Sequence, residues 1–201
     1  MPTNAQEQVN RLNDQVIQLY RQGEYERAIP IAIQACDLAR HHFGEKHPTF
    51  ATSLNNLALL YKETGRYDEA EPMCQQVLEI DRMTVGEHHP DYATSLTSLA
   101  ELYRSMGKSA EAEPLYQQAL RIRVRTLGNR SLHVAQSLDN LAELYRSMGK
   151  YAEAEPVRSV HSKPWQHGGK VAGRRTLTTI FLTLGAIPNL RNGPQTAVPP
   201  L

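Results

Sequence analysis

Histidines gather at two points of the sequence, where metal binding is the first chemistry to consider. They are His41, His42 and His47 at the first point, and His88 and His89 at the second. Imidazole nitrogens at such spacing can bind zinc or copper. The corresponding third segment, residues 129–131, contains no histidine, so the pattern does not persist along the chain. We therefore interpret these residues as ordinary loop and helix-end histidines and expect no metal site.

The two cysteines, Cys36 and Cys74, fall on the apolar faces of predicted helices. A free cysteine in such a place behaves as a small apolar side chain. The sequence has no CxxC pair, and two cysteines alone support neither a zinc site nor a disulfide framework. We therefore expect two buried thiols.

Signatures of catalysis are sparse. Residues 107–109 read Gly-Lys-Ser, like the end of a phosphate-binding loop, but Leu102 stands where that motif requires its first glycine. Neither a GxSxG nor a HExxH motif occurs. Carboxylate pairs such as Glu69 and Glu71 recur along the chain at helix starts, where the helix dipole favours negative charge. We therefore expect no enzyme activity and no cofactor.

A repeating helical unit has to position all of these residues. Four glycines recur every 42 residues, with similar sequence around each: Gly23, Gly65, Gly107 and Gly149. Apolar residues at helical spacing precede the glycine, as at Leu54, Leu57 and Tyr61, and a second apolar stripe that includes Ala70 and Val77 follows it. The glycine between them can adopt left-handed backbone angles at little cost. Each unit is therefore predicted to be a helical hairpin that stacks on its neighbours.

Prolines mark where two of these hairpins begin. Pro48 and Pro90 are predicted to open the first helices of the second and third units, because a proline there loses no helical hydrogen bond. The residue before a proline is pushed towards an extended conformation. His47 and His89 are accordingly predicted to end the connecting loops.

The repeated residues carry a family resemblance. The series in the third unit resembles a tetratricopeptide repeat: Leu99, Ala100, Tyr103, Gly107, Ala112 and Tyr116. The 42-residue period, with a Val-Gly element and His-Pro between units, resembles the kinesin-light-chain type. The resemblance covers residues 8–157 and implies an all-α fold, a right-handed superhelical solenoid of helical hairpins. We expect an array over residues 1–157, with units at about 8–48, 49–90, 91–132 and a truncated 133–157.

The same resemblance implies a binding groove. In this family the first helix of each unit lines a concave face that holds extended peptides. The corresponding polar residues of this chain are Asn13, Asn55, Asn56, Lys62, Thr97, Arg104, Asp139, Asn140 and Arg146. Asparagine suits peptide binding because its amide both donates and accepts hydrogen bonds, and Arg or Lys would favour acidic ligands. The alternative is that these residues solvate a helix face or brace neighbouring helices, and the middle unit breaks the asparagine pattern with Ser98.

The end of the chain departs from the repeat. From residue 158 to residue 201 the helical period disappears, acidic residues are absent, and Gly and Pro become frequent. We expect a divergent, poorly ordered tail. Three interpretations stay open: a capping or targeting tail, a basic disordered arm, or the product of a frame change in the gene.

Charge and hydropathy limit the classes of partner that we expect this chain to bind. With 22 basic and 21 acidic residues interleaved and a formal net charge of +1, the chain lacks the basic bias of nucleic-acid binding proteins. No segment has the length and apolarity of a secretory signal or a membrane span. We expect a soluble, cytoplasmic adaptor or scaffold that binds a protein or peptide, with self-association through exposed array ends. The resemblance leaves two alternatives: a sensor or oligomerisation fragment of a larger signalling ATPase, or a kinesin-light-chain-like cargo adaptor.

Overall fold

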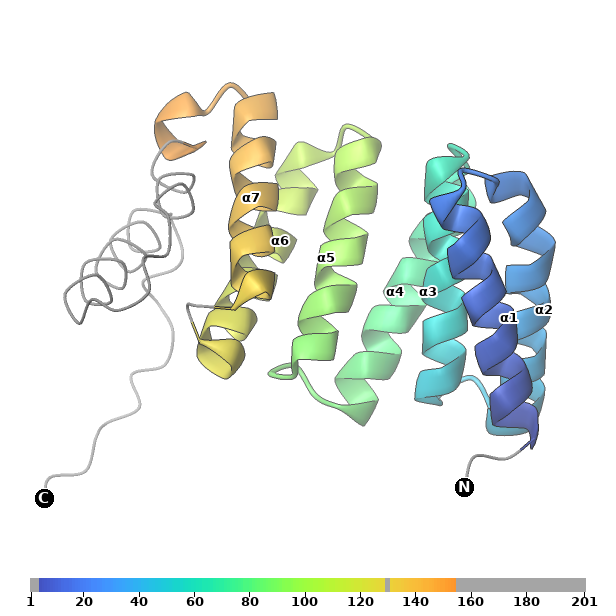
Figure 1. The fold of residues 1–201 in the computed structure, drawn as a ribbon. Helices are drawn as coiled ribbons and strands as arrows, with labels where there is room; N and C mark the ends of the chain where they lie inside the picture. The colour runs from blue at the N-terminus through green and yellow to red at the C-terminus, as the bar shows by residue number, and fades with distance from the viewer. Residues whose placement is uncertain (1–3, 129–130, 155–201) are drawn as a thin grey trace, which may run out of the picture. The chain divides into compact units, whose positions relative to one another are not determined.

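The computed structural model describes residues 4–128 and 131–154 (Figure 1). The predictions for the tail, residues 158–201, and for the last residues of the array lie outside these ranges. The described residues form two compact units that divide after Gly128. Each unit is described by itself below.

The first unit consists of consecutive α-helices, and no strand occurs in the described residues. The helices are α1 (Asn4–Arg21), α2 (Tyr25–Phe43), α3 (Pro48–Glu63), α4 (Tyr67–Thr84), α5 (Pro90–Ser105) and α6 (Ser109–Leu127). Contacts pair α1 with α2, α3 with α4 and α5 with α6, so the predicted helical hairpins are confirmed for these three units.

Local sequence explains where these helices begin and end. His47 has extended backbone angles, with φ −92° and ψ 141°, and Pro48 begins α3 directly after it, as predicted. The helix ends before Gly65, whose φ of +75° lies in the left-handed region that favours glycine. The amide of Arg66 then donates to the carbonyl oxygen of Tyr61 over 2.8 Å, which closes the turn into α4.

The first helices of the three hairpins form one face of this unit. Helix α1 contacts α3, and α3 contacts α5, whereas no comparable contact joins α2 to α4 or α4 to α6. Successive first helices are thus closer together than successive second helices, so the stack curves with α1, α3 and α5 on its concave side. We call this side the inner face.

Small residues let the helices of the stack approach closely. Ala58, Ala70, Ala100 and Ala112 are each no more than 1% exposed. They lie on both helices of the second and third hairpins, where an alanine permits interaxial distances near the lower end of the usual 8–10 Å range, about 8 Å. Cys36 and Cys74 are both buried free thiols, as the sequence predicts. Burial raises the pKa of Cys36 to about 12 and that of Cys74 to about 11.

Helix α1 differs from α3 and α5 on one side. Gln15 and Gln18 are exposed in α1, whereas the residues 42 positions later, Leu57 and Leu60, are buried in α3. The same contrast holds for Gln8 against Phe50. Because α3 packs on α2 and α5 packs on α4, whereas no helix precedes α1 in the described residues, we call this polar surface the outer side of α1. Its polar residues suit exposure to water, as in the capping repeats of solenoids.

The second unit contains α7 (Leu132–Ser147). Ser131 precedes it with extended backbone angles, and its hydroxyl accepts a hydrogen bond from the amide of His133. The apolar residues Leu138, Leu141 and Tyr145 of α7 are buried. The helix ends before Gly149, which has a φ of +72°, as in the turns of the first unit.

Candidate functional site

The predicted groove residues of the first unit lie on its three inner-face helices. Asn13 lies in α1; Asn55, Asn56 and Lys62 lie in α3; Thr97 and Arg104 lie in α5. Asp139, Asn140 and Arg146 lie in α7 of the second unit. The contacts of the predicted groove residues in the first unit show which of their side chains already make hydrogen bonds or ion pairs within the fold.

Asn13 and Asn56 join α1 to α3. The side-chain amide of Asn56 donates to Oδ1 of Asn13 over 3.2 Å, and the amide of Asn13 donates to Oγ of Ser53 over 3.1 Å. Asn13 is only 7% exposed, so both of these hydrogen bonds are shielded from water. We call this arrangement of Asn13, Ser53 and Asn56 the closed junction. Its contacts favour the bracing role for Asn13 and Asn56.

The equivalent residues between α3 and α5 are arranged differently. A shift of 42 positions turns Asn13, Ser53 and Asn56 into Asn55, Ser95 and Ser98. Ser95 donates instead to the carboxylate of Asp81 in α4. Neither the side chain of Asn55 nor that of Ser98 has a hydrogen-bond partner within the described residues. We call this arrangement the open junction.

A cavity lies at the open junction. It has a volume of about 140 Å³ and is lined by Asn55, Ala58, Leu59, Lys62, Cys74, Ser98, Glu101 and Leu102. The lining combines apolar side chains with an amide, a hydroxyl, a thiol and the charged groups of Lys62 and Glu101, so it offers both van der Waals contact and hydrogen bonding. The cavity is smaller than the pockets of about 300–1,000 Å³ that hold whole small molecules, so it offers room for one small group.

Charged residues line the edge of this cavity and link the three inner-face helices. The ammonium group of Lys62 lies 3.4 Å from the carboxylate of Glu101 in α5 and 3.2 Å from that of Glu63. Glu63 also accepts a hydrogen bond from the hydroxyl of Tyr20 in α1 over 3.3 Å. Burial, followed by the charge of Glu63, raises the pKa of Tyr20 to about 12. Lys62 is therefore held between two carboxylates and is a poor anchor for a third.

The remaining predicted groove residues have varied environments. Thr97 is half-buried, and its hydroxyl donates to the carbonyl oxygen of Ala93 in its own helix over 2.9 Å. Arg104 is half-buried and has interactions of its own. In α7, Asn140 is half-buried, whereas Asp139 and Arg146 are exposed. The proposed groove role of all nine residues stays a prediction.

Two of the clustered histidines have a structural role that the sequence analysis missed. Nδ1 of His47 accepts a hydrogen bond from the amide of Thr49 over 3.1 Å, and Nδ1 of His89 accepts one from the amide of Asp91 over 3.2 Å. Both imidazoles therefore cap the start of a helix, as Ser131 does for α7. A serine at the corresponding position of the third connection was the signal for this role, since serine is a preferred helix cap.

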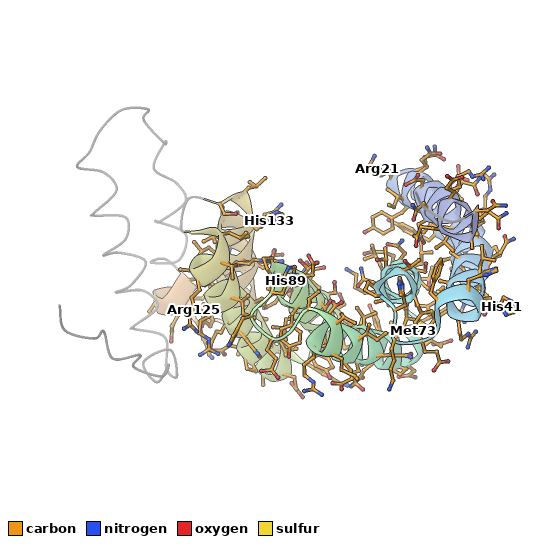
Figure 2. The ribbon with its side chains drawn as sticks, turned by 90° about the horizontal axis from the view of Figure 1, so that it is seen from below. Arg21, His41, Met73, His89, Arg125 and His133 are labelled. Atoms are coloured by element: carbon orange, nitrogen blue, oxygen red, sulfur yellow. The ribbon has the colours of Figure 1, made fainter. Side chains whose placement is uncertain are left out.

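The two histidine groups do not meet in the fold. His41 lies near the end of α2 and His89 before the start of α5, well separated in Figure 2. Among the described residues, no group of three or more His, Cys, Asp or Glu side chains could hold a metal ion. In the same part of the chain, no helix has the length and apolarity needed to cross a membrane.

Comparison with known proteins agrees with this architecture. The family model for the tetratricopeptide repeat matches residues 12–80, 49–123 and 109–157. A search of curated proteins finds no match.

Solved structures with the same fold include repeat proteins of the kinesin-light-chain type. One from Podosopora anserina has nearly identical TPR-like repeats assigned to a kinesin light chain; it is 22% identical, with a TM-score of 0.72, over 94% of this chain and 92% of that one. The structure of a variant of that protein matches equally well, with a TM-score of 0.72 and 22% identity over 95% and 92% of the two chains. BtubC (BKLC) from P. vanneervenii has a TM-score of 0.62 at 22% identity, over 94% of this chain and 85% of that one. These likenesses confirm the predicted all-α solenoid of helical hairpins.

Proposed function

Because the chain belongs to the tetratricopeptide repeat family, whose fold is a protein-interaction scaffold, we propose that it binds an extended peptide of a partner protein on its inner face. Binding is reversible and involves no chemistry. The peptide would lie across α1, α3 and α5 and use polar side chains that the fold leaves unengaged. For the second unit we propose separately that Asp139, Asn140 and Arg146 of α7 contact a peptide.

The open junction is the observation that carries this proposal. Asn55 and Ser98 lie beside a cavity with no hydrogen-bond partner in the described residues, while the closed junction uses the equivalent amide for bracing. An amide that can both donate and accept is suited to a peptide group, which presents one donor and one acceptor per residue. A surface with no binding role would gain nothing from an amide and a hydroxyl that lie without partners beside a cavity.

Selection from a displayed library of random linear peptides tests the proposal with the full chain as bait. We expect a family of related peptides to be enriched. Two matched variants then locate the site, because Ile17 of α1 and Ile33 of α2 are both 39% exposed. Ile17 occupies the repeat position of Leu59 and Glu101, which line the cavity on the inner face, whereas Ile33 lies on a second helix.

Ile17→Lys together with Asn55→Arg should weaken binding of a selected peptide by at least about tenfold, which corresponds to the loss of one well-buried contact. Ile33→Lys together with Gln34→Arg adds the same side chains to α2 and should leave binding within about twofold, since surface changes away from a contact have little effect. Fluorescence anisotropy with a labelled peptide measures both. Enrichment of no peptide, or equal losses in the two variants, would show that the inner face is not the binding surface.

A further inference from the structure

The two junctions between successive first helices differ by a few side chains, and this difference creates the cavity. At the closed junction Asn56 supplies an amide that pairs with the amide of Asn13 over 3.2 Å. Ser98 stands at the equivalent position of the open junction and is too short to supply that group. The pairing that the fold completes at the first junction is thus left incomplete at the second.

A second difference between the two junctions concerns the serine that precedes each of them in the first helix. At the closed junction Ser53 accepts a hydrogen bond from Asn13, and the residue of α2 that stands 42 positions before Asp81 is Ala39, which has no polar side-chain atom. The equivalent of Ala39 is Asp81, whose carboxylate accepts the hydroxyl proton of Ser95. The hydroxyl of Ser95 thus bonds to α4, and within the described residues the side chain of Asn55 bonds neither to Ser95 nor to Ser98.

We infer that the open junction is a pocket for a primary carboxamide, the side chain of an asparagine or glutamine in the bound peptide. This inference rests on the proposed peptide-binding function. It names the chemical group of the peptide that is recognised at one place on the inner face. The incoming amide would take the place that the amide of Asn56 occupies at the closed junction. It would pair with Asn55 and could also bond to the hydroxyl of Ser98, while its methylene groups contact Ala58, Leu59 and Leu102.

The size of the cavity fits such a group. Its volume of about 140 Å³ is close to the roughly 150 Å³ of an apolar cavity that admits benzene. A carboxamide with one or two methylene groups is smaller than benzene, so it enters without displacing the walls.

The charges beside the cavity favour an uncharged ligand. Lys62 is flanked by Glu63 and Glu101, so the three groups together carry a net negative charge. A carboxylate would be repelled by this net charge, and an ammonium group would lose water while competing with the ammonium group of Lys62 for the same two carboxylates. A carboxamide carries no charge and still supplies both a donor and an acceptor.

Titration with small amides tests the pocket without any peptide. Isotope-labelled full chain is titrated with propionamide and, separately, with propionate and propylammonium, and the side-chain amide signals of Asn55 and Asn13 are followed by NMR. We expect a saturable shift of the Asn55 signal with propionamide and binding at least about tenfold weaker with the two charged probes. The signal of Asn13 should not move, because its amide is already paired.

Three variants make the test specific. Ser98→Asn restores the missing amide and should abolish the response of Asn55, because the new amide at position 98 then pairs with Asn55 within the chain. Ser105→Asn makes the same change at an exposed position of α5 and should bind propionamide like the natural chain. Asn56→Ser frees Oδ1 of Asn13 for propionamide, and the Asn13 signal should then shift, by less than that of Asn55 because the amide of Asn13 still donates to Ser53. Dispersed NMR spectra establish that each variant is folded.

The outcomes separate this inference from the proposed function. Absence of a saturable Asn55 shift, an equal response to the charged probes, or an unchanged response in Ser98→Asn would overturn the carboxamide pocket. If library peptides nevertheless bind the inner face, the proposed function stands without it. If propionamide binds as expected but no peptide is enriched, the pocket stands and the peptide-binding function is wrong.

Discussion

Replacing either of two equivalent asparagines by alanine should have opposite effects on stability. Asn13 and Asn55 lie 42 residues apart at the same point of the repeat. Asn13 is 7% exposed and makes two side-chain hydrogen bonds, to Ser53 and from Asn56. Asn55 makes none within the described residues. The same substitution therefore removes bracing at one position and only an unpaired amide at the other.

The expected magnitudes follow from these contacts. A hydrogen bond between uncharged groups contributes about 1 kcal/mol net, so Asn13→Ala loses about 2 kcal/mol. Alanine is a better helix former than asparagine by about 0.5 kcal/mol, which reduces the net loss to about 1.5 kcal/mol. Asn55→Ala has only the second effect and should be stabilising by about 0.5 kcal/mol.

Urea unfolding of the full chain, followed by circular dichroism, measures the two effects. With a slope of about 2 kcal/mol/M, Asn13→Ala should lower the midpoint by about 0.75 M and Asn55→Ala should raise it by about 0.25 M. A double-mutant cycle between Asn13 and Asn56 should give a coupling free energy of about 1 kcal/mol, whereas the cycle between Asn55 and Ser98 should give about 0.

Two results would refute the reasoning. If Asn13→Ala costs no more than Asn55→Ala, the amides of the closed junction do not stabilise the stack. If the two cycles give equal coupling, the distinction between closed and open junctions is not real in solution, and the cavity loses its explanation. Both comparisons require that the slope of the unfolding transition is unchanged between variants.

Three further predictions concern caps, charge and turns. His89→Ala removes the acceptor that caps α5 and should lower the free energy of unfolding by about 1 kcal/mol, whereas His88→Ala, an exposed loop change, should shift it by less than about 0.5 kcal/mol; equal shifts would exclude the capping role. Burial raises the pKa of Asp81, so its folded form holds the proton more tightly, and ionisation opposes folding as the pH rises. Asp81→Asn should therefore gain stability over the natural chain between about pH 4 and pH 7, and a difference that shrinks over that range in parallel urea titrations would contradict this. Gly65→Ala should lose about 1–2 kcal/mol from its φ of +75° alone, because a Cβ there meets nothing within 4 Å; Gly65→Asn should lose less, and equal thermal midpoints would argue against left-handed strain.

The helices and turns of the array could be predicted because they depend on residues close together in the sequence. A glycine every 42 residues marks a turn that needs left-handed angles, and Gly65 has them. The extended conformation of His47 follows from Pro48 alone. That the imidazole then accepts a helix amide was missed because histidine is an uncommon cap, although Ser131 in the third connection pointed to it.

The division of the inner face into a closed and an open junction could not be predicted. It depends on which side chains of neighbouring hairpins meet, and the pattern within a single unit does not specify these meetings. The sequence showed that Ser98 interrupts a series of asparagines, but not that Asn56 faces Asn13 rather than solvent. It also could not show that Ser95 donates to Asp81 of a second helix.

The polar outer side of α1 bears on how such an array could be lengthened by protein engineering. A copy of the α3–α4 hairpin inserted after α4 would find compatible neighbours, because the buried Phe50 and Leu57 recur as the buried Tyr92 and Leu99. The same copy fused ahead of α1 would have to pack its apolar residues against Gln15 and Gln18. Internal duplication is therefore the modification that the interfaces accept, and each added hairpin that carries serine at the position of Ser98 would extend the inner face by one more open junction.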